Sequence, residues 1–95
     1  MSEENEILYG RGFLKDVQKL PPPIQDKLAD QIEIARKDIF DSRLHTKALS
    51  RPLLGKYSLR VTRDWRVGFI FLGPHKVFLL AADNRKRIYK RLGKI

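Results

Sequence analysis

The hydrophobic pattern changes its period near residue 56, and this change narrows the choice of folds more than any other feature. Before it, apolar residues recur every three or four positions, as along one face of an α-helix. After it, apolar and polar residues alternate, as in a half-buried β-strand. A chain of 95 residues has room for one core. We therefore predict one α+β domain over residues 1–95, with two N-terminal helices packed on a small antiparallel sheet.

Two helices and a short strand are predicted before this change. Residues 5–10 predict the strand, and residues 13–20 and 24–40 each place their apolar side chains on one helical face. The prolines at 21–23 end the first helix and can begin the second, because proline is tolerated in a first turn. The apolar stripe of the second helix consists of Ile24, Leu28, Ile32, Ala35 and Ile39. We expect Ile32 to lie in the core shared with the sheet.

Three strands are predicted after the change, over residues 57–61, 66–71 and 77–82. The last of them is apolar on both faces, so we expect it to be central in the sheet. Residues 41–55 have no clean period, and their leucines predict a loop held against the body of the domain.

Two arginines flank the predicted turn between the first two of these strands. A three-residue loop over 63–65 would place Val61 opposite Val67. That register puts Arg60 and Arg66 on one face, away from the core. A two-residue loop would bury one of the two arginines, which is costly. We therefore predict guanidinium groups that converge on the same face of the sheet.

Positive charge is concentrated in the second half of the chain. The net charge is +9; residues 1–41 contribute 6 − 9 = −3 and residues 42–95 contribute 14 − 2 = +12. Such a field attracts polyanions, of which nucleic acid is the most common in cells. We favour a surface that faces nucleic acid or the ribosome over a basic face that is merely solvated.

Composition and spacing disfavour several other classes of protein. The chain has no cysteine, which excludes disulfides and thiolate metal sites. Met1 is followed by acidic residues rather than by the basic start of a signal peptide, and the apolar runs are too short to span a membrane. We therefore expect a cytoplasmic protein. The two histidines lack carboxylates at ligand spacing, and no Gly-rich phosphate loop is present, so we expect no metal and no cofactor.

The leading candidates for chemistry are Arg60, Arg66, Arg85 and Tyr89. Arginine stays charged and its planar fork matches phosphate oxygens, so converging arginines can stabilise the phosphorane of phosphodiester cleavage. The phenol of Tyr89 could stack on a base or transfer a proton. From the residues alone, however, packing of the C-terminal segment is the simpler explanation of Tyr89.

Three further side chains have both a functional and a structural explanation. His45 lies in a loop beside the sheet, where functional residues gather, and the two explanations are balanced there. His75 is expected to be an exposed turn residue. Trp65 could stack on a base or shield the end of the hairpin, and shielding is favoured because it needs no partner. The full set of expected RNA contacts is Lys47, Lys56, Arg63, Trp65, Lys86, Arg87, Lys90 and Arg91.

Three stretches of the chain resemble the RelE/ParE superfamily of bacterial type II toxin–antitoxin toxins. They are LHTKAL at 44–49, YSLRVTRDWRVGFIF at 57–71 and NRKRIYKRL at 84–92. The resemblance covers about residues 7–92. Its most specific parts are the strand that begins with tyrosine, the DWRV at the start of the next strand, and the closing RKRIY.

This resemblance implies a RelE-like fold of the microbial-RNase type and an endoribonuclease that cuts messenger RNA, typically on the ribosome. It implies a cognate acidic antitoxin that silences the toxin, and a toxin–antitoxin complex that binds operator DNA through the antitoxin. In the implied reaction the ribose 2′-hydroxyl attacks the adjacent phosphorus. Arg66 and Arg85 would stabilise the phosphorane, Arg60 would position the backbone, and Tyr89 would stack or assist proton transfer. We favour His45 as the general base.

The chain also departs from the family pattern. Ser58 stands where a RelE-like strand often carries a second basic residue. Where toxins similar to YafQ place histidines, this chain has Lys47 and Arg60, although Asp64 and Trp65 match. A second hypothesis is therefore a non-catalytic binder, either a ParE-like toxin that inhibits DNA gyrase or a decayed module that only binds an antitoxin or DNA.

Overall fold

The computed structural model describes residues 3–95. Its strands are β1 (Glu6–Tyr9), β2 (Lys47–Ala48), β3 (Tyr57–Arg60), β4 (Trp65–Gly73) and β5 (Lys76–Asn84). Its helices are α1 (Arg11–Lys19), α2 (Pro22–Lys37), the short 3-10 helix η1 (Ser42–Leu44) and α3 (Ile88–Leu92). The strands form one sheet in the order β1-β5-β4-β3-β2. The prediction that the last strand lies inside the sheet is therefore confirmed.

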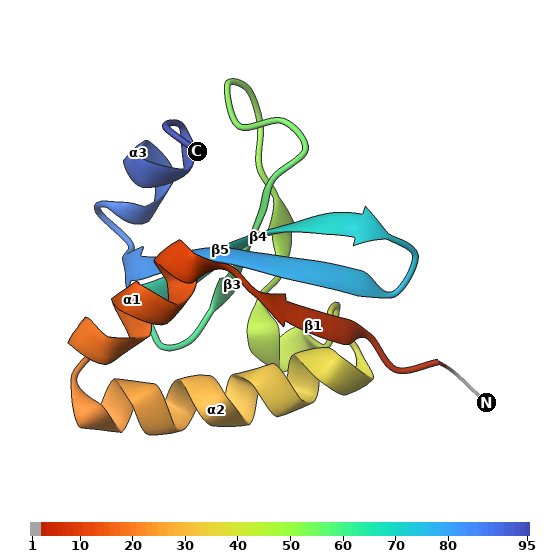
Figure 1. Cartoon of the computed structure of the whole chain (residues 1–95), viewed down its shortest axis with the longest axis horizontal. Coiled ribbons are helices and arrows are strands. Elements are labelled where there is room, and N and C mark those ends of the chain that lie inside the picture. Colours follow the sequence, from red (N-terminus) through yellow and green to blue (C-terminus); the bar gives the residue numbers. More distant parts are fainter. Residues whose placement is uncertain (1–2) are drawn as a thin grey trace.

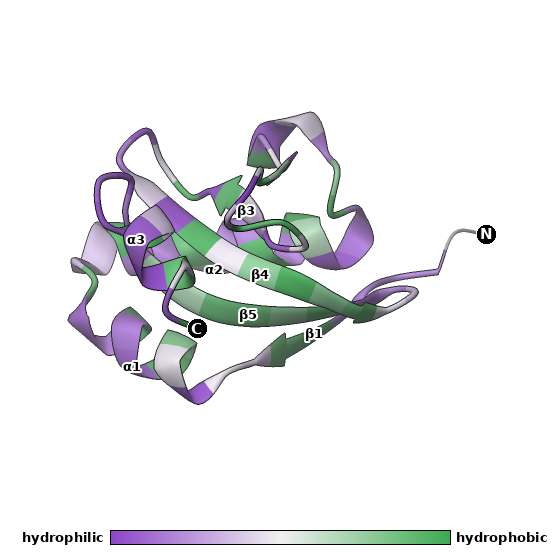
Figure 2. Cartoon of the chain, turned by 90° about the horizontal axis from the view of Figure 1, so that it is seen from above, coloured by the Kyte–Doolittle hydropathy of each residue, from purple (hydrophilic) through white to green (hydrophobic). Residues whose placement is uncertain are grey.

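Helices cover both faces of the sheet, with α1 and α2 on one face and α3 on the other (Figure 1). The larger core lies under α1 and α2, and its fully buried aromatic side chains are Phe13 and Phe69. A smaller cluster beneath α3 consists of Leu49, Ala81, Ile88 and Leu92. Figure 2 shows the apolar residues concentrated along β4 and β5, in the middle of the molecule. The expected α+β architecture is confirmed.

One strand runs in a direction that was not predicted. β1 pairs with β5 in parallel, with Ile7 opposite Val77, whereas all other strand pairs among residues 3–95 are antiparallel. Antiparallel neighbours can be joined by a tight hairpin, but parallel neighbours need a long connection. Here both helices and three strands separate β1 from β5 along the chain, so no turn fixes their relative direction.

The buried face of α2 differs from the predicted stripe, because Ile24 and Ile32 are only partly buried and Ile39 lies beyond the end of the helix. Its buried side chains are Leu28, Gln31 and Ala35. Ile32, which was expected in the core shared with the sheet, is partly buried and packs against that core. Gln31 takes a buried position on the same helix, where it donates to carbonyl groups of β3 and η1.

Candidate active site

The sheet face beneath α3 carries two cross-strand rows of side chains that combine polar and cationic groups. The first row runs across β2, β3, β4 and β5 through Lys47, Ser58, Gly68 and Ala81. The second row, one pleat further on, consists of Arg60, Arg66 and Asp83. Directly opposite residues in a sheet share a face and lie close together. The rows therefore bring residues from four strands into one surface, over which α3 lies.

The hairpin between β3 and β4 has a longer loop than predicted. Val67 lies opposite Leu59 rather than Val61, so the pairing is displaced by two residues. Side chains alternate between faces with a period of two, and a displacement by two keeps every side chain on its predicted face. The prediction that Arg60 and Arg66 share a face is therefore confirmed, and in this register they are direct cross-strand neighbours.

This arginine pair forms a fixed cationic position. Like charges directly opposite one another destabilise a sheet, so a bound anion would relieve the repulsion. Arg66 Nη1 donates to the carbonyl oxygens of Thr62 (2.7 Å) and Arg63 (2.7 Å) in the hairpin loop. Arg60 Nε is buried and has no partner among residues 3–95. No ion pair within the described part of the chain involves Arg60 or Arg66.

Tyr89, on α3, lies over the first row beside this pair. The Lys47 ammonium is 5.3 Å from the centre of its ring. Partial burial of the phenol raises the pKa of Tyr89, but interaction with the Ser58 hydroxyl and the positive charges of Lys47 and Arg66 outweigh it. The net pKa of Tyr89 is lower than that of an ordinary tyrosine. Each of these neighbours favours the phenolate, so the site is built to help Tyr89 lose a proton.

Gly68 explains how α3 comes so close to the sheet. Leu92, fully buried, lies directly over Gly68, and a Cβ at that glycine would be 2.4 Å from its Cδ2. Tyr89 is one helical turn from Leu92, so the glycine also sets the height of the phenol above Ser58. Asn84 stabilises the turn that leads into α3, because its Oδ1 accepts from the backbone N–H groups of Lys86 and Arg87.

We expect Gly68→Ala to displace α3 and to cost about 1–3 kcal/mol of stability, as overpacking of a core does. Urea denaturation measures this cost. Gly73→Ala is the matched control, because a Cβ at Gly73 meets nothing within 4 Å. Equal stability of the two variants would show that Leu92 is not held against the sheet as described.

The comparisons with known proteins agree on the fold. No family model and no curated protein matches the sequence. Among solved structures, the toxin–antitoxin complex RelBE2 from Mycobacterium tuberculosis aligns with a TM-score of 0.71 and 24% identity, over 90% of this chain and 95% of that chain. The archaeal RelE–RelB complex from Pyrococcus horikoshii aligns with a TM-score of 0.72 and 17% identity, over 88% of this chain and 98% of that chain. YafQ from E. coli aligns with a TM-score of 0.71 and 17% identity, over 90% of this chain and 99% of that chain.

This chain has the RelE/ParE-type toxin fold. In it, Arg60, Arg66 and Tyr89 come together, as the sequence predicted, and Lys47 joins them.

Arg85 and His45 stand apart from this group. Arg85 directly follows β5, where its Nε is 3.6 Å from a carboxylate oxygen of Asp64 and its backbone N–H donates to Asp64 O (2.7 Å). His45 is exposed in the left-handed conformation at the end of η1. Arg85 precedes α3, so it does not share a helical face with Tyr89.

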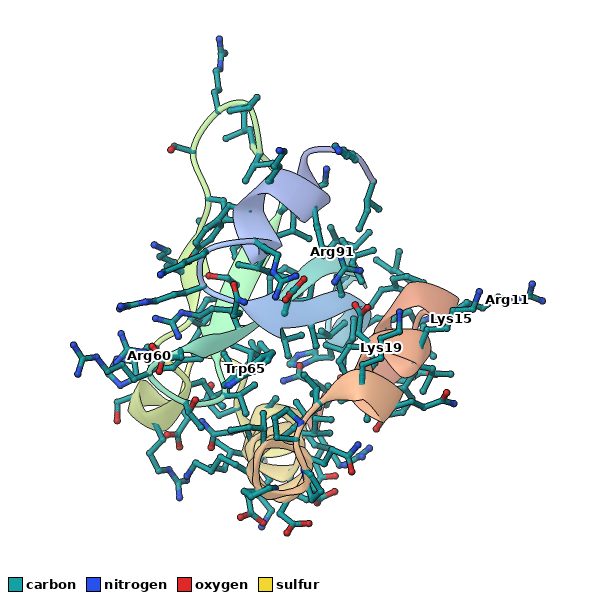
Figure 3. All side chains as sticks on the ribbon, turned by 90° about the vertical axis from the view of Figure 1, so that its left-hand side faces the viewer. Arg11, Lys15, Lys19, Arg60, Trp65 and Arg91 are labelled. Atoms are coloured by element: carbon teal, nitrogen blue, oxygen red, sulfur yellow. The ribbon has the colours of Figure 1, made fainter. Side chains whose placement is uncertain are left out.

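Trp65 and Arg91, two of the predicted RNA contacts, make contacts within the protein. Trp65 packs against the larger core, on the sheet face opposite Tyr89, which is the shielding position. Arg91 Nη2 donates to both carboxylate oxygens of Asp16 on α1 (3.0 and 2.9 Å), and its Nη1 donates to Asp83 (3.0 Å). This network ties α3 to α1. Figure 3 shows Arg60 on one side of Trp65 and the exposed cations of α1, among them Lys15, on the other.

The remaining predicted RNA contacts are placed as follows. Lys56 is occupied, because its Nζ donates to the carbonyl oxygens of Leu92 (2.7 Å) and Ile95 (3.1 Å) at the end of α3. The other side chains of the set are exposed or half-buried around the loop and α3, and they are Arg63, Lys86, Arg87 and Lys90.

Two residues of the site were missed or misread from the sequence. Ser58 was taken as the loss of a basic group, but it is 2% exposed and acts on the phenol of Tyr89. Gln31, also 2% exposed, donates from Nε2 to the carbonyl oxygens of Arg60 (2.9 Å) and Arg43 (3.1 Å). It therefore fixes the end of β3 where Arg60 emerges. The signal for Gln31 was its position between Leu28 and Ala35 in the apolar stripe.

Over residues 3–95, no three His, Asp or Glu side chains gather as a metal site would require. No helix in the same residues is long and apolar enough to cross a bilayer.

Proposed function

We propose that this chain is the toxin of a type II toxin–antitoxin module and that it cleaves messenger RNA. The observation that carries the proposal is the cross-strand pair Arg60–Arg66 beside Tyr89, whose pKa is lowered by Ser58, Lys47 and Arg66 despite its partial burial. A fixed pair of guanidinium groups suits a phosphodiester, and a tyrosine poised to lose its proton suits activation of a hydroxyl.

In the proposed reaction, the Tyr89 phenolate accepts the proton of a ribose 2′-hydroxyl, and the resulting oxygen attacks the adjacent phosphorus. The bond to the 5′-oxygen breaks, that oxygen takes a proton from water, and Tyr89 returns its proton to solvent. The products are a 2′,3′-cyclic phosphate and a 5′-hydroxyl. Arg60 and Arg66 stabilise the added negative charge on the phosphorane. Tyr89 takes the role of general base in place of His45, because His45 is exposed after the end of η1, whereas Ser58, Lys47 and Arg66 all act on the phenol of Tyr89. Arg85, at the edge of the loop, holds the RNA backbone.

The proposed partners follow from the same surface. Proteins of the same fold were solved as toxin–antitoxin complexes, RelE with RelB from Methanococcus jannaschii and YoeB with YefM from Staphylococcus aureus. We propose that an acidic antitoxin segment folds over the arginine face and neutralises it. The messenger RNA is bound on the ribosome, and operator DNA is bound by the antitoxin in the complex.

Primer extension on a reporter message tests the proposal. Cells that express the chain without antitoxin should arrest growth and should show new 5′ ends in the message, and co-expression of the cognate acidic antitoxin should prevent both. If arrest occurs without cut message, the proposal of cleavage fails and a toxin that inhibits gyrase is favoured. If neither occurs, the chain is a non-catalytic binding module.

Ser58→Ala should raise the pKa of Tyr89, because it removes an interaction that favours the phenolate. At a pH below the pKa of Tyr89 in both the unaltered chain and the variant, the variant has less phenolate. Its cleavage rate should therefore fall by the same factor as its phenolate fraction. A titration of the tyrosine Cζ resonances by NMR measures the pKa without reference to activity. Ser42→Ala, at an exposed serine on η1, is the control. An unchanged Tyr89 titration in Ser58→Ala would refute this role of Ser58.

A further inference from the structure

A hollow of about 320 Å³ adjoins Tyr89, and neither Arg60 nor Arg66 lines it. It lies between β2, the loop over residues 49–53 and the ring of Tyr89. The loop between β2 and β3 projects from the body on the same side as α3 (Figure 1). The candidate active site therefore continues from the phenol into an open, shallow hollow and does not end at the tyrosine.

The walls of this hollow are held in place from both ends. Within the loop, Leu53 N–H donates to Ser50 O (2.8 Å), and Leu49 N–H donates to Lys56 O (3.0 Å). Lys56 Nζ in turn donates to Leu92 O (2.7 Å) at the end of α3. The loop and the helix that carries Tyr89 are thus fastened to one another, and the hollow is formed before any ligand enters it.

The floor of the hollow is apolar and its rim is cationic. Leu49 belongs to the cluster beneath α3, and Leu53 and Tyr89 pack against that cluster. Lys47 and Arg51 supply positive charge, and no acidic residue lines the hollow. Such a lining suits a flat apolar group that is joined to a phosphate.

The free edge of β2 adds hydrogen-bonding groups to the lining. Leu49 N–H bonds to Lys56 across the sheet, and bonded pairs alternate along an antiparallel ladder. The backbone N–H and C=O of the preceding residue, Ala48, therefore point away from β3, towards the open edge. Ala48 lines the hollow, so a backbone donor and a backbone acceptor are available to a polar ring edge.

We propose that this hollow is a nucleobase subsite. It binds the base of one nucleotide that flanks the scissile phosphate, with the ring against Leu53 and Tyr89 and its polar edge at the backbone of Ala48. This subsite rests on the proposed cleavage of RNA, and it would be the part of the chain that selects which RNA sequence is cleaved. Stacking on an aromatic ring tolerates any base, whereas backbone groups at the rim discriminate among them.

Binding of 2′-deoxy dinucleotides to the full chain tests the subsite. These molecules lack the attacking hydroxyl and so are not cleaved. We expect amide resonances of residues 48–53 to shift when the intact dinucleotide binds. Removal of one of its two bases should abolish those shifts and weaken binding at least about 10-fold, which corresponds to about 1.4 kcal/mol.

If both abasic dinucleotides bind as tightly as the intact one, the subsite is refuted while the phosphate site stands. If the intact dinucleotide shifts the resonances of neither Arg60 nor Arg66, the proposed function itself fails.

A pair of adjacent leucines gives a matched test of specificity. Leu53 lines the hollow, whereas Leu54 is 70% exposed and does not. Leu53→Ala should bring the affinity of the intact dinucleotide close to that of the abasic one and should broaden the sequences found at cleaved ends. Leu54→Ala should change neither. Circular dichroism establishes that both variants are folded, and the dinucleotide comparison on the unaltered chain holds if Leu53→Ala does not fold. Unchanged base preference in a folded Leu53→Ala would overturn the proposal.

Discussion

Replacement of Tyr89 by phenylalanine should lower the rate of RNA cleavage by about 10²–10⁴-fold, which is the usual contribution of a general acid or base. The substitution keeps the ring that lies beside Lys47 and removes only the hydroxyl, whose pKa is lowered by Ser58, Lys47 and Arg66 despite partial burial. Binding of a 2′-deoxy dinucleotide should change little. Single-turnover cleavage and the dissociation constant, measured on the same protein, separate the two effects.

Tyr57→Phe is the control for this experiment. Tyr57 stacks on Phe69 (ring centroids 5.6 Å apart) and contacts the edge of Phe71, on the sheet face opposite Tyr89. Loss of its hydroxyl should leave cleavage unchanged. Equal rates for the unaltered chain and Tyr89→Phe would exclude proton transfer by the phenol and would return His45 to consideration as the base.

The second large effect is expected at Arg66. Arg66→Ala should lower cleavage by about 10²–10³-fold, as does the loss of other groups that stabilise charge in a transition state. It should also destabilise the fold by about 1–3 kcal/mol, because Nη1 donates to the carbonyl oxygens of Thr62 and Arg63. Cleavage must therefore be measured at a temperature at which denaturation curves show the variant to be folded.

Two variants separate the chemical role of Arg66 from its structural one. Arg66→Lys keeps the charge but loses the planar fork, so it should recover only part of the activity. Arg11→Ala removes an exposed arginine at the start of α1, outside the predicted RNA contacts, and should leave cleavage within a few fold of the unaltered chain. A folded Arg66→Ala that cleaves as fast as the unaltered chain would remove this residue from the proposed mechanism.

Local pattern predicted most of the secondary structure and the face on which the arginines lie. Alternation predicted β3 and β4, and a short apolar run predicted β5. The polarity of Arg60 and Arg66 excluded any register that would bury one of them. The exact pairing escaped this reasoning. A displacement of two residues leaves every side chain on its face, so the hydrophobic pattern cannot distinguish the two registers. The loop that Arg66 holds with its own guanidinium decides between them.

Long-range contacts settled what the local pattern left open. The parallel direction of β1, the bond from Gln31 to the end of β3, and the approach of α3 to Gly68 all join residues far apart along the chain. The same holds for Ser58. Its type and position suggested a missing cation, and only the packing of α3 places it against a phenol whose pKa it lowers. Residue type and spacing determine which face each group occupies, because the backbone period is local. Which groups meet on that face depends on how distant elements pack, and this step created the surroundings of Tyr89.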